Sequence, residues 1–176
     1  MSIFDDMKRG LDSLISPSKD RLAHELFDEL KRKHLRVSTA ESCTGGRLAD
    51  TLVSIEGVSE VYPGGFVTYS DEAKARDLSV SRTALSQHTA VSSEVSRQMA
   101  MGLHMKTGAD LCLTTTGMAG PTGGSPSCPV GTVYISAFYK GQVLTRHFVF
   151  RGNREAVRNQ AVREALVLGL FMLQED

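Results

Sequence analysis

The sequence R-V-S-T-A-E-S-C-T-G-G-R-L-A-D-T-L-V-S-I, residues 36–55, changes from one kind of pattern to another within a few positions. Its beginning, residues 36–40, is a short apolar run that is typical of a buried strand. Its end, residues 46–55, places Leu48, Leu52 and Ile55 on one face of a helix. The stretch therefore predicts a strand that passes directly into a helix, which is the repeating unit of an α/β sheet.

The same alternation continues along the chain. The other predicted strands are residues 64–69, 110–115, 132–139 and 142–150. The other predicted helices are residues 17–34, a short helix capped by Ser70, a helix capped by Ser92 and a long terminal helix that starts near Asn153. Only Lys140 and Gly141 separate the last two strands, which is a hairpin signal. We expect an α/β fold with three αβα layers and a mixed, mostly parallel sheet that includes one β-hairpin.

Residues 1–16 form a separate unit, with Ile3, Phe4, Met7, Leu11, Leu14 and Ile15 at helical spacing. We expect an extra N-terminal helix here, as an appendage to a single domain of residues 17–176. Ser16 and Pro17 predict the cap and the first position of the next helix. The apolar face of the appendage and the exposed edge of the hairpin are two candidate surfaces for a homo-oligomer, and we expect at least a dimer.

The composition excludes several classes of protein. The chain of 176 residues is 41% hydrophobic and 23% charged with zero formal net charge, which argues against a nucleic-acid-binding protein. We expect no signal peptide, because acidic residues interrupt the apolar ones at the start of the sequence, and no apolar run approaches the roughly 20 residues of a membrane helix. Its three cysteines are widely separated and contain no C-x-x-C pair, which argues against disulfides and a zinc site. We expect a cytoplasmic protein without a metal or cofactor and without membrane partners.

Three polar stretches follow predicted strands: residues 41–46, 69–74 and 116–131. In open α/β sheets, ligands bind beyond the carboxyl ends of the strands. The three stretches are therefore expected to meet at one site.

Ser42 has two interpretations. It or Thr44 can cap the following helix, with Gly45 and Gly46 permitting a tight turn, and capping is the commoner role of a serine in this position. Alternatively, Ser42 is a nucleophile at a helix N-terminus, where backbone N–H groups stabilise an oxyanion. Cys43 is a rival nucleophile because a helix N-terminus lowers the pKa of a thiol, although small buried packing is its commoner role.

A serine nucleophile needs a base. Of the histidines, only His88 lies in a polar turn, and the pattern places none for a Ser-His-Asp arrangement. Lys74 is the better candidate, since burial can lower the pKa of a lysine, but a surface pair with Asp71 is an equally simple role. Tyr69 either packs against the sheet or transfers a proton.

The loop T-G-M-A-G-P-T-G-G, residues 116–124, matches neither phosphate-binding fingerprint. Its glycines still permit close approach of the backbone to a phosphate or a sugar. Arg154, directly after Asn153, is a candidate anion contact, although an exposed arginine on a helix needs no special role.

Taken in order, A-E-S-C-T-G-G, G-F-V-T-Y-S-D-E-A-K, A-V-S, T-G-M-A-G-P-T-G-G, P-V-G-T-V and G-N-R resemble the motifs of the CinA C-terminal domain family. The resemblance covers roughly residues 22–173. Characterised members of this family are nicotinamide-nucleotide amidases, which convert nicotinamide mononucleotide to nicotinic acid mononucleotide and ammonia. The family members tend to form oligomers.

The resemblance implies roles for individual residues. Ser42 would be the nucleophile, Lys74 its base and Tyr69 an assisting group, with the helix N-terminus stabilising the oxyanion. The residues implied in substrate binding are Glu41, Cys43, Thr44, Gly45, Gly46, Thr116, Gly117, Gly120 and Arg154. Two alternatives stay open: a non-catalytic module that binds a pyridine nucleotide, and a serine amidase that acts on another small amide.

Overall fold

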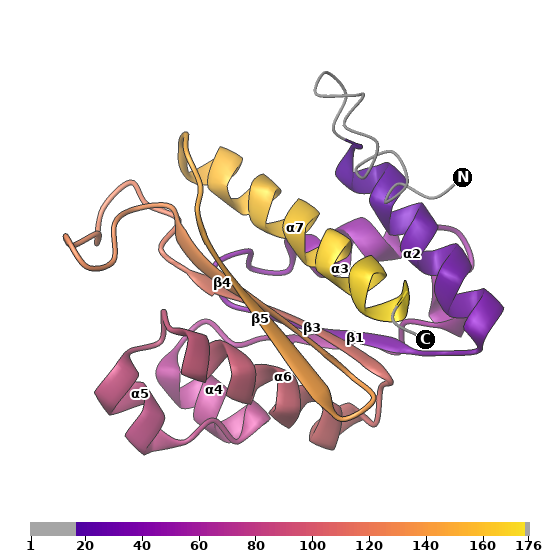
Figure 1. Cartoon of the computed structure of the whole chain (residues 1–176), viewed down its shortest axis with the longest axis horizontal. Coiled ribbons are helices and arrows are strands. Elements are labelled where there is room, and N and C mark those ends of the chain that lie inside the picture. The colour runs from indigo at the N-terminus through magenta and orange to yellow at the C-terminus, as the bar shows by residue number, and fades with distance from the viewer. Residues whose placement is uncertain (1–16, 175–176) are drawn as a thin grey trace.

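A five-stranded mixed sheet forms the centre of the protein (Figure 1). The computed structural model describes residues 17–174. The strand order is β2-β1-β3-β4-β5, and the strands are β1 Val37–Glu41, β2 Gly65–Val67, β3 Leu111–Gly117, β4 Thr132–Tyr139 and β5 Gln142–Val149. β1 pairs in parallel with β2 and β3, whereas β3–β4 and β4–β5 are antiparallel. The predicted mixed sheet with one hairpin is confirmed.

Helices cover both faces of the sheet, which confirms the three-layer prediction (Figure 1). One face is covered by α2 Lys19–Lys33, α3 Arg47–Val53 and α7 Arg154–Gln174. The other is covered by α4 Asp71–Leu78, α5 Arg82–His88 and α6 Ser93–Thr107. A single 3-10 turn, Val58–Glu60, joins α3 to β2.

Two apolar cores lie on opposite faces of the sheet. Leu111 and Leu113 of β3 belong to the core under α2, α3 and α7, whereas Cys112 belongs to the core under α6. This division follows from the alternation of side chains along a strand. β1 is buried along its whole length and has a helical layer on either side. The sheet and the two helical layers therefore fix the position of the carboxyl end of β1 and of the residues that follow it.

Side-chain caps determine where most of the helices begin. Ser70 and Ser92 accept hydrogen bonds from Ala73 N and Val95 N, and Asn153 accepts one from Ala156 N, as predicted. The predicted start of the first described helix is wrong. Ser18, and not Ser16, caps α2 by accepting a hydrogen bond from Arg21 N, since Pro17 lies before the helix.

The hairpin between β4 and β5 turns at Lys140 and Gly141, which have φ angles of 47° and 78°. Positive φ at both central residues matches the right-handed twist of the strands. The sequence signal for this turn is confirmed.

Some predictions differ from the structure or lie outside the described residues. Residues 82–88 form α5, which was not predicted, so His88 ends a helix and does not lie in a polar turn. Ser81 starts this helix by accepting a hydrogen bond from Ala84 N. The expected helix in residues 1–16 lies outside the described part of the chain. None of the helices within residues 17–174 is long and apolar enough to cross a membrane.

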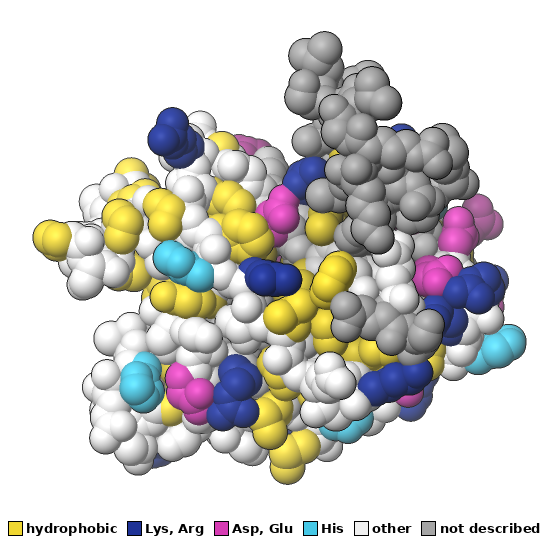
Figure 2. Space-filling view, in the orientation of Figure 1, with side chains coloured by type: hydrophobic (Ala, Val, Ile, Leu, Met, Phe, Trp, Pro, Cys, Tyr) yellow, Lys and Arg dark blue, Asp and Glu magenta, His cyan; other side chains and the backbone are white. Residues whose placement is uncertain are grey.

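The face shown in Figure 2 carries hydrophobic side chains over β5 and α7. Phe148, Val167, Leu168 and Phe171 line a shallow cavity of about 230 Å³ there, together with Arg146 and Glu164. This cavity contains none of the residues that the sequence singles out for chemistry.

Candidate active site

Ser42 is the first residue after β1, and its backbone continues alongside β3. Its N–H donates to the carbonyl of Thr115 at 2.9 Å, so its position is tied to the centre of the sheet. The side chain is 7% exposed. The sheet therefore presents this hydroxyl at the carboxyl ends of the parallel strands, where ligands are expected.

Lys74 lies on α4, and its side chain is directed into the protein and not toward solvent. It is 1% exposed, and its Nζ lies 3.1 Å from Ser42 Oγ and 2.9 Å from the carbonyl oxygen of Thr68. The structure forms no salt bridge between Lys74 and Asp71 among the residues that it describes, so the surface-pair interpretation is wrong. Desolvation lowers the pKa of Lys74, and the negative charge of Asp71 only partly opposes this effect. A lowered pKa favours the neutral amine, which can accept a proton.

Glu41 caps α3. This contact corrects the expectation that Ser42 or Thr44 caps the helix and the expectation that the N-terminus of the helix stabilises an oxyanion. The carboxylate is fully buried and accepts hydrogen bonds from Gly46 N, Leu48 N and Ala49 N at 2.8–3.0 Å. Neither Ser42 nor Thr44 is the cap. The N-terminus of α3 already binds an anion, so it does not have these N–H groups available for an oxyanion.

Cys43 is not an activated thiol. Its pKa is raised to about 12, mainly by burial and in smaller part by the nearby Glu41 carboxylate. The expectation of a lowered pKa is wrong because the thiol is desolvated. Cys43 fits the small, buried packing role.

Tyr69 and Arg154 meet at the rim of the site. Tyr69 is 63% exposed, which excludes the half-buried packing role. Its hydroxyl accepts a hydrogen bond from Arg154 Nη2 at 3.1 Å, and Arg154 Nη1 donates to the carbonyl of Gly120 at 2.8 Å. Arg154 thus links the end of β2, the glycine-rich loop and the start of α7.

These residues surround a cavity of about 330 Å³. Its lining consists of Ser42, Cys43, Tyr69, Lys74, Ala90, Val91, Thr116, Gly117, Met118, Ala119, Gly120, Thr122 and Arg154. All three predicted catalytic residues and five of the predicted substrate-binding residues are among them.

Four predicted substrate-binding residues do not line this cavity. Glu41 lies beneath it as the cap of α3, and Thr44 Oγ1 is 2.6 Å from Thr115 Oγ1 in the interior. Gly45 and Gly46 form the turn into α3 with positive φ angles. The structure gives these residues a role in shaping the turn and no place in the wall of the cavity.

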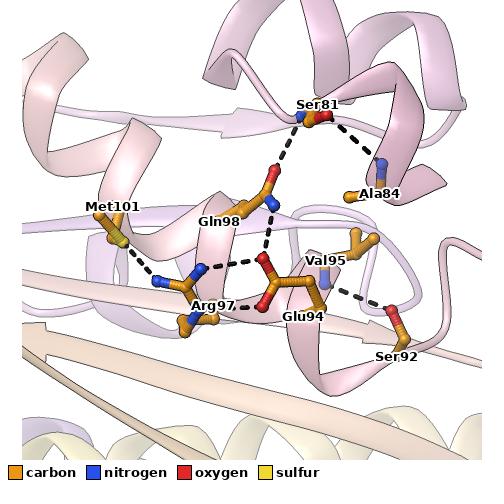
Figure 3. Close-up of polar contacts among 8 residues, drawn as sticks. All are labelled: Ser81, Ala84, Ser92, Glu94, Val95, Arg97, Gln98 and Met101. Atoms are coloured by element: carbon orange, nitrogen blue, oxygen red, sulfur yellow. Dashed lines mark hydrogen bonds and ion pairs between the residues drawn. The ribbon is translucent and has the colours of Figure 1, made fainter. Parts of the chain in front are cut away.

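The connection between α5 and α6 forms one wall of the cavity through Ala90 and Val91. Thr116 holds this wall by donating to the carbonyl of Ala90 at 2.7 Å. Figure 3 shows the polar contacts nearby: Glu94 accepts from Arg97 and Gln98, and Gln98 accepts from Ser81 N. The hydrogen bond from Arg97 helps hold the pKa of Glu94 at about 2. These contacts join the starts of α5 and α6.

Sequence reasoning missed Arg158. This residue of α7 donates from Nη2 to the carbonyl of Thr44 at 2.6 Å, although it is far away in the sequence. Arg154 and Arg158 are four residues apart and therefore lie on one face of the predicted helix. This spacing was the signal that the sequence offered. Thr68 and Thr115, which contact Lys74 and Thr44, carried no signal beyond their place in predicted strands.

No group of three or more histidine, cysteine, aspartate or glutamate side chains within residues 17–174 is arranged to hold a metal ion. The lining of the cavity contains no histidine. Lys74 is thus the basic group beside Ser42 in the described site.

Comparison with known proteins gives consistent results. The model of the CinA C-terminal domain matches residues 19–172. A putative competence-damage inducible protein of Clostridium botulinum (strain Okra) is 39% identical over 155 residues, which are 88% of this chain and 38% of that protein. The chain thus spans about two fifths of the length of such curated relatives.

Solved structures match along nearly their whole length. A competence-damaged protein (CinA) superfamily protein from Klebsiella pneumoniae has a TM-score of 0.87 and 37% identity, covering 91% of this chain and 100% of that one. Another from Escherichia coli has a TM-score of 0.87 and 38% identity, covering 98% and 99%.

Proposed function

The chain belongs to the CinA C-terminal domain family, and we propose that it is an amidohydrolase that converts nicotinamide mononucleotide to nicotinic acid mononucleotide and ammonia. The observation that supports this most strongly is the 3.1 Å contact between Lys74 Nζ and Ser42 Oγ in a buried position. A serine paired with a lysine is a known variant of nucleophile and base, and it needs no metal.

The environment of Lys74 suits a base. Its pKa is lowered mainly by burial, so a larger fraction of the amine is neutral near neutral pH than for a lysine in water. The carbonyl of Thr68 accepts one hydrogen of Nζ and thereby fixes the orientation of the amine. The lone pair of the neutral amine can then face Ser42.

The reaction would proceed in two halves. In the first, Ser42 Oγ attacks the carboxamide carbon while its proton passes to Lys74 Nζ. The tetrahedral oxyanion collapses, the C–N bond breaks, and Lys74 returns the proton to the leaving nitrogen, which departs as ammonia. In the second, water attacks the ester and gives its proton to Lys74. The ester C–O bond breaks, Ser42 recovers a proton, and the carboxylic acid leaves.

The charge of the cavity favours an anionic substrate. Arg154 is the positively charged residue of its lining, and neither aspartate nor glutamate lines it. Arg154 lies at the exposed rim, where a phosphate group can reach it while the carboxamide lies at Ser42. The hydroxyls of Thr116 and Thr122 and the loop backbone offer hydrogen-bonding groups for the ribose.

The test is release of ammonia from nicotinamide mononucleotide by the wild type, by Ser42→Ala and by Ser54→Ala. Ser54 is an exposed serine at the end of α3 and serves as a matched control. We expect Ser42→Ala to lose about 10³-fold or more in rate and Ser54→Ala to lose nothing.

The other outcomes identify the alternatives. Binding of the nucleotide without ammonia release would replace the proposal with a non-catalytic binding module. Turnover of other small amides but not of nicotinamide mononucleotide would replace the proposed substrate. Equal rates for wild type and Ser42→Ala would contradict the proposed nucleophile.

A further inference from the structure

Thr116 lies near the carboxyl end of β3, beside Ser42. β1 and β3 are parallel, with Glu41 opposite Thr115, and Ser42 N continues the pairing by donating to the Thr115 carbonyl. Ser42 and Thr116 are therefore the next residues along two neighbouring strands, which run about 4.8 Å apart. Both residues line the cavity. A carboxamide within reach of Ser42 Oγ therefore also lies next to Thr116.

The side chains of Ser42 and Thr116 lie on the same side of the sheet. Successive side chains along a strand alternate between the two faces, and paired residues of neighbouring strands share a face. Ser42 Oγ lies 3.1 Å from Nζ of Lys74 on α4. Thr116 Oγ1 lies 2.7 Å from the carbonyl oxygen of Ala90, between α5 and α6. Both hydroxyls therefore face the layer of α4, α5 and α6.

The single hydrogen of the Thr116 hydroxyl is already used within the protein. A carbonyl oxygen only accepts, so Thr116 is the donor in its contact with Ala90. The segment that carries this carbonyl is itself held, because Thr89 N donates to Leu85 O at 3.1 Å and Ser92 Oγ donates to Thr89 O at 3.0 Å. Within residues 17–174, no group donates to Thr116 Oγ1. Toward a ligand, this oxygen is therefore an acceptor.

An acceptor at this position distinguishes an amide from an acid. The NH2 group of a carboxamide carries two hydrogens and can donate one of them to Thr116 Oγ1. A carboxylate is ionised at neutral pH, and both of its oxygens are acceptors, so it brings lone pairs against the lone pairs of Thr116. Turning the Thr116 hydrogen toward the carboxylate would leave the Ala90 carbonyl without this donor, which costs free energy.

We propose that Thr116 is a specificity-determining residue, which accepts a hydrogen bond from the carboxamide nitrogen and thereby favours the amide substrate over the carboxylate product. A hydroxyl in this cavity can also serve the ribose, but the position of Thr116 beside Ser42 favours the reacting end of the substrate. Thr122 and the loop backbone then serve the ribose. This inference rests on the proposed function in one respect, that a carboxamide lies at Ser42.

The experiment compares the binding of nicotinamide mononucleotide and nicotinic acid mononucleotide at pH 7 by calorimetry. All proteins carry Ser42→Ala, so that the amide is not consumed. Thr116→Val removes the hydroxyl and keeps the shape of the side chain, whereas Thr116→Ser keeps the hydroxyl. Thr114→Val is the matched control, because Thr114 Oγ1 also donates from β3 to a carbonyl, that of Ser96 at 3.3 Å, but does not line the cavity.

The readout is the Kd of the acid divided by the Kd of the amide. We expect Thr116→Val to lower this ratio by about 10- to 100-fold, because the amide loses a hydrogen bond and the acid loses a repulsion. Thr116→Ser and Thr114→Val should change the ratio by less than about threefold. If Thr116 only holds the wall of the cavity, Thr116→Val would shift both constants in the same direction. An unchanged ratio in Thr116→Val would therefore overturn the inference.

Enzyme with an intact Ser42 provides a second measurement. There, Thr116→Val should strengthen inhibition by the acid relative to KM for the amide, by about the same factor. If the wild type releases no ammonia but the ratio of the two Kd values depends on Thr116 as expected, the amidase proposal fails and this inference stands. Ammonia release with a ratio that does not depend on Thr116 would reject this inference and leave the amidase proposal standing. Failure of both nucleotides to bind would also overturn the inference.

Discussion

The buried wall and the exposed rim of the cavity are built in opposite ways. The buried wall contains Ser42 and Lys74, which the sheet and α4 place in contact with little exposure to solvent. The rim contains Tyr69 and Arg154, which are exposed and joined by one hydrogen bond between side chains. The wall is therefore held in the interior of the protein, whereas the side chains of the rim are exposed to solvent. Under the proposed function, the chemical step belongs to the wall and recognition of the substrate to the rim.

Lys74 tests the wall and should give the largest effect. Lys74→Met removes the base, and we expect kcat to fall by about 10²–10⁴-fold with little change in KM. Lys106→Met, which changes an exposed lysine of α6, should have no effect. Steady-state kinetics with nicotinamide mononucleotide provides the measurement. Near-normal turnover of Lys74→Met would show that Lys74 is not the base and would contradict the placement of the chemical step at the buried wall.

Arg154 tests the rim, and its effect should fall on binding. Loss of one charge-assisted contact to a phosphate costs about 1.5–3 kcal/mol, so Arg154→Met should raise KM by about 10- to 100-fold and change kcat less. The control is Arg151→Met, an exposed arginine before α7. A loss confined to kcat would show that the rim takes part in the chemical step.

Tyr69 should give a smaller effect than Arg154. Its hydroxyl accepts a hydrogen bond from Arg154, so Tyr69→Phe should weaken the rim and raise KM by about two- to tenfold. The family resemblance implies that Tyr69 assists the reaction. If Tyr69 transfers a proton, Tyr69→Phe would instead lower kcat by about 10²-fold or more. The split between kcat and KM distinguishes the two roles.

The burial of Lys74 should also appear in stability, as the smallest effect. The folded pKa lies below 10.5, so folding disfavours the protonated amine, and this penalty is present in full at pH values below the folded pKa. It disappears as the pH rises from the folded pKa toward 10.5. We expect the melting temperature of Lys74→Met to lie a few degrees above that of the wild type at pH 7, which corresponds to about 1 kcal/mol of stability. The difference should be smaller at pH 10. A constant difference between pH 7 and pH 10 would contradict a titrating Lys74.

The sequence predicted those features that depend on neighbouring residues. Ser70, Ser92 and Asn153 cap helices by bonds to residues three positions later, and Lys140-Gly141 makes a two-residue turn. Each of these signals is complete within a few residues, so no knowledge of the fold is needed to interpret it.

The site could be predicted only in part, because its decisive contacts depend on tertiary structure. A lysine three residues after Asp71 resembles a surface pair until the fold places α4 against Ser42 and excludes water from Lys74. Glu41 lies in a strand and gives no capping signal, since its carboxylate reaches N–H groups five to eight residues ahead. Arg158 contacts Thr44 across most of the chain. The motifs identified which residues matter, and the fold identified how they interact.

The central claim is that Ser42, activated by the buried amine of Lys74, attacks the carboxamide. Rapid quenching of a single turnover with nicotinamide mononucleotide, followed by mass spectrometry of the peptide that contains Ser42 and Cys43, tests it most directly. The account predicts an adduct of the substrate less ammonia on Ser42, which is absent in Ser42→Ala and retained in Cys43→Ala. An adduct on Cys43, or ammonia release by Ser42→Ala at the wild-type rate, would contradict it.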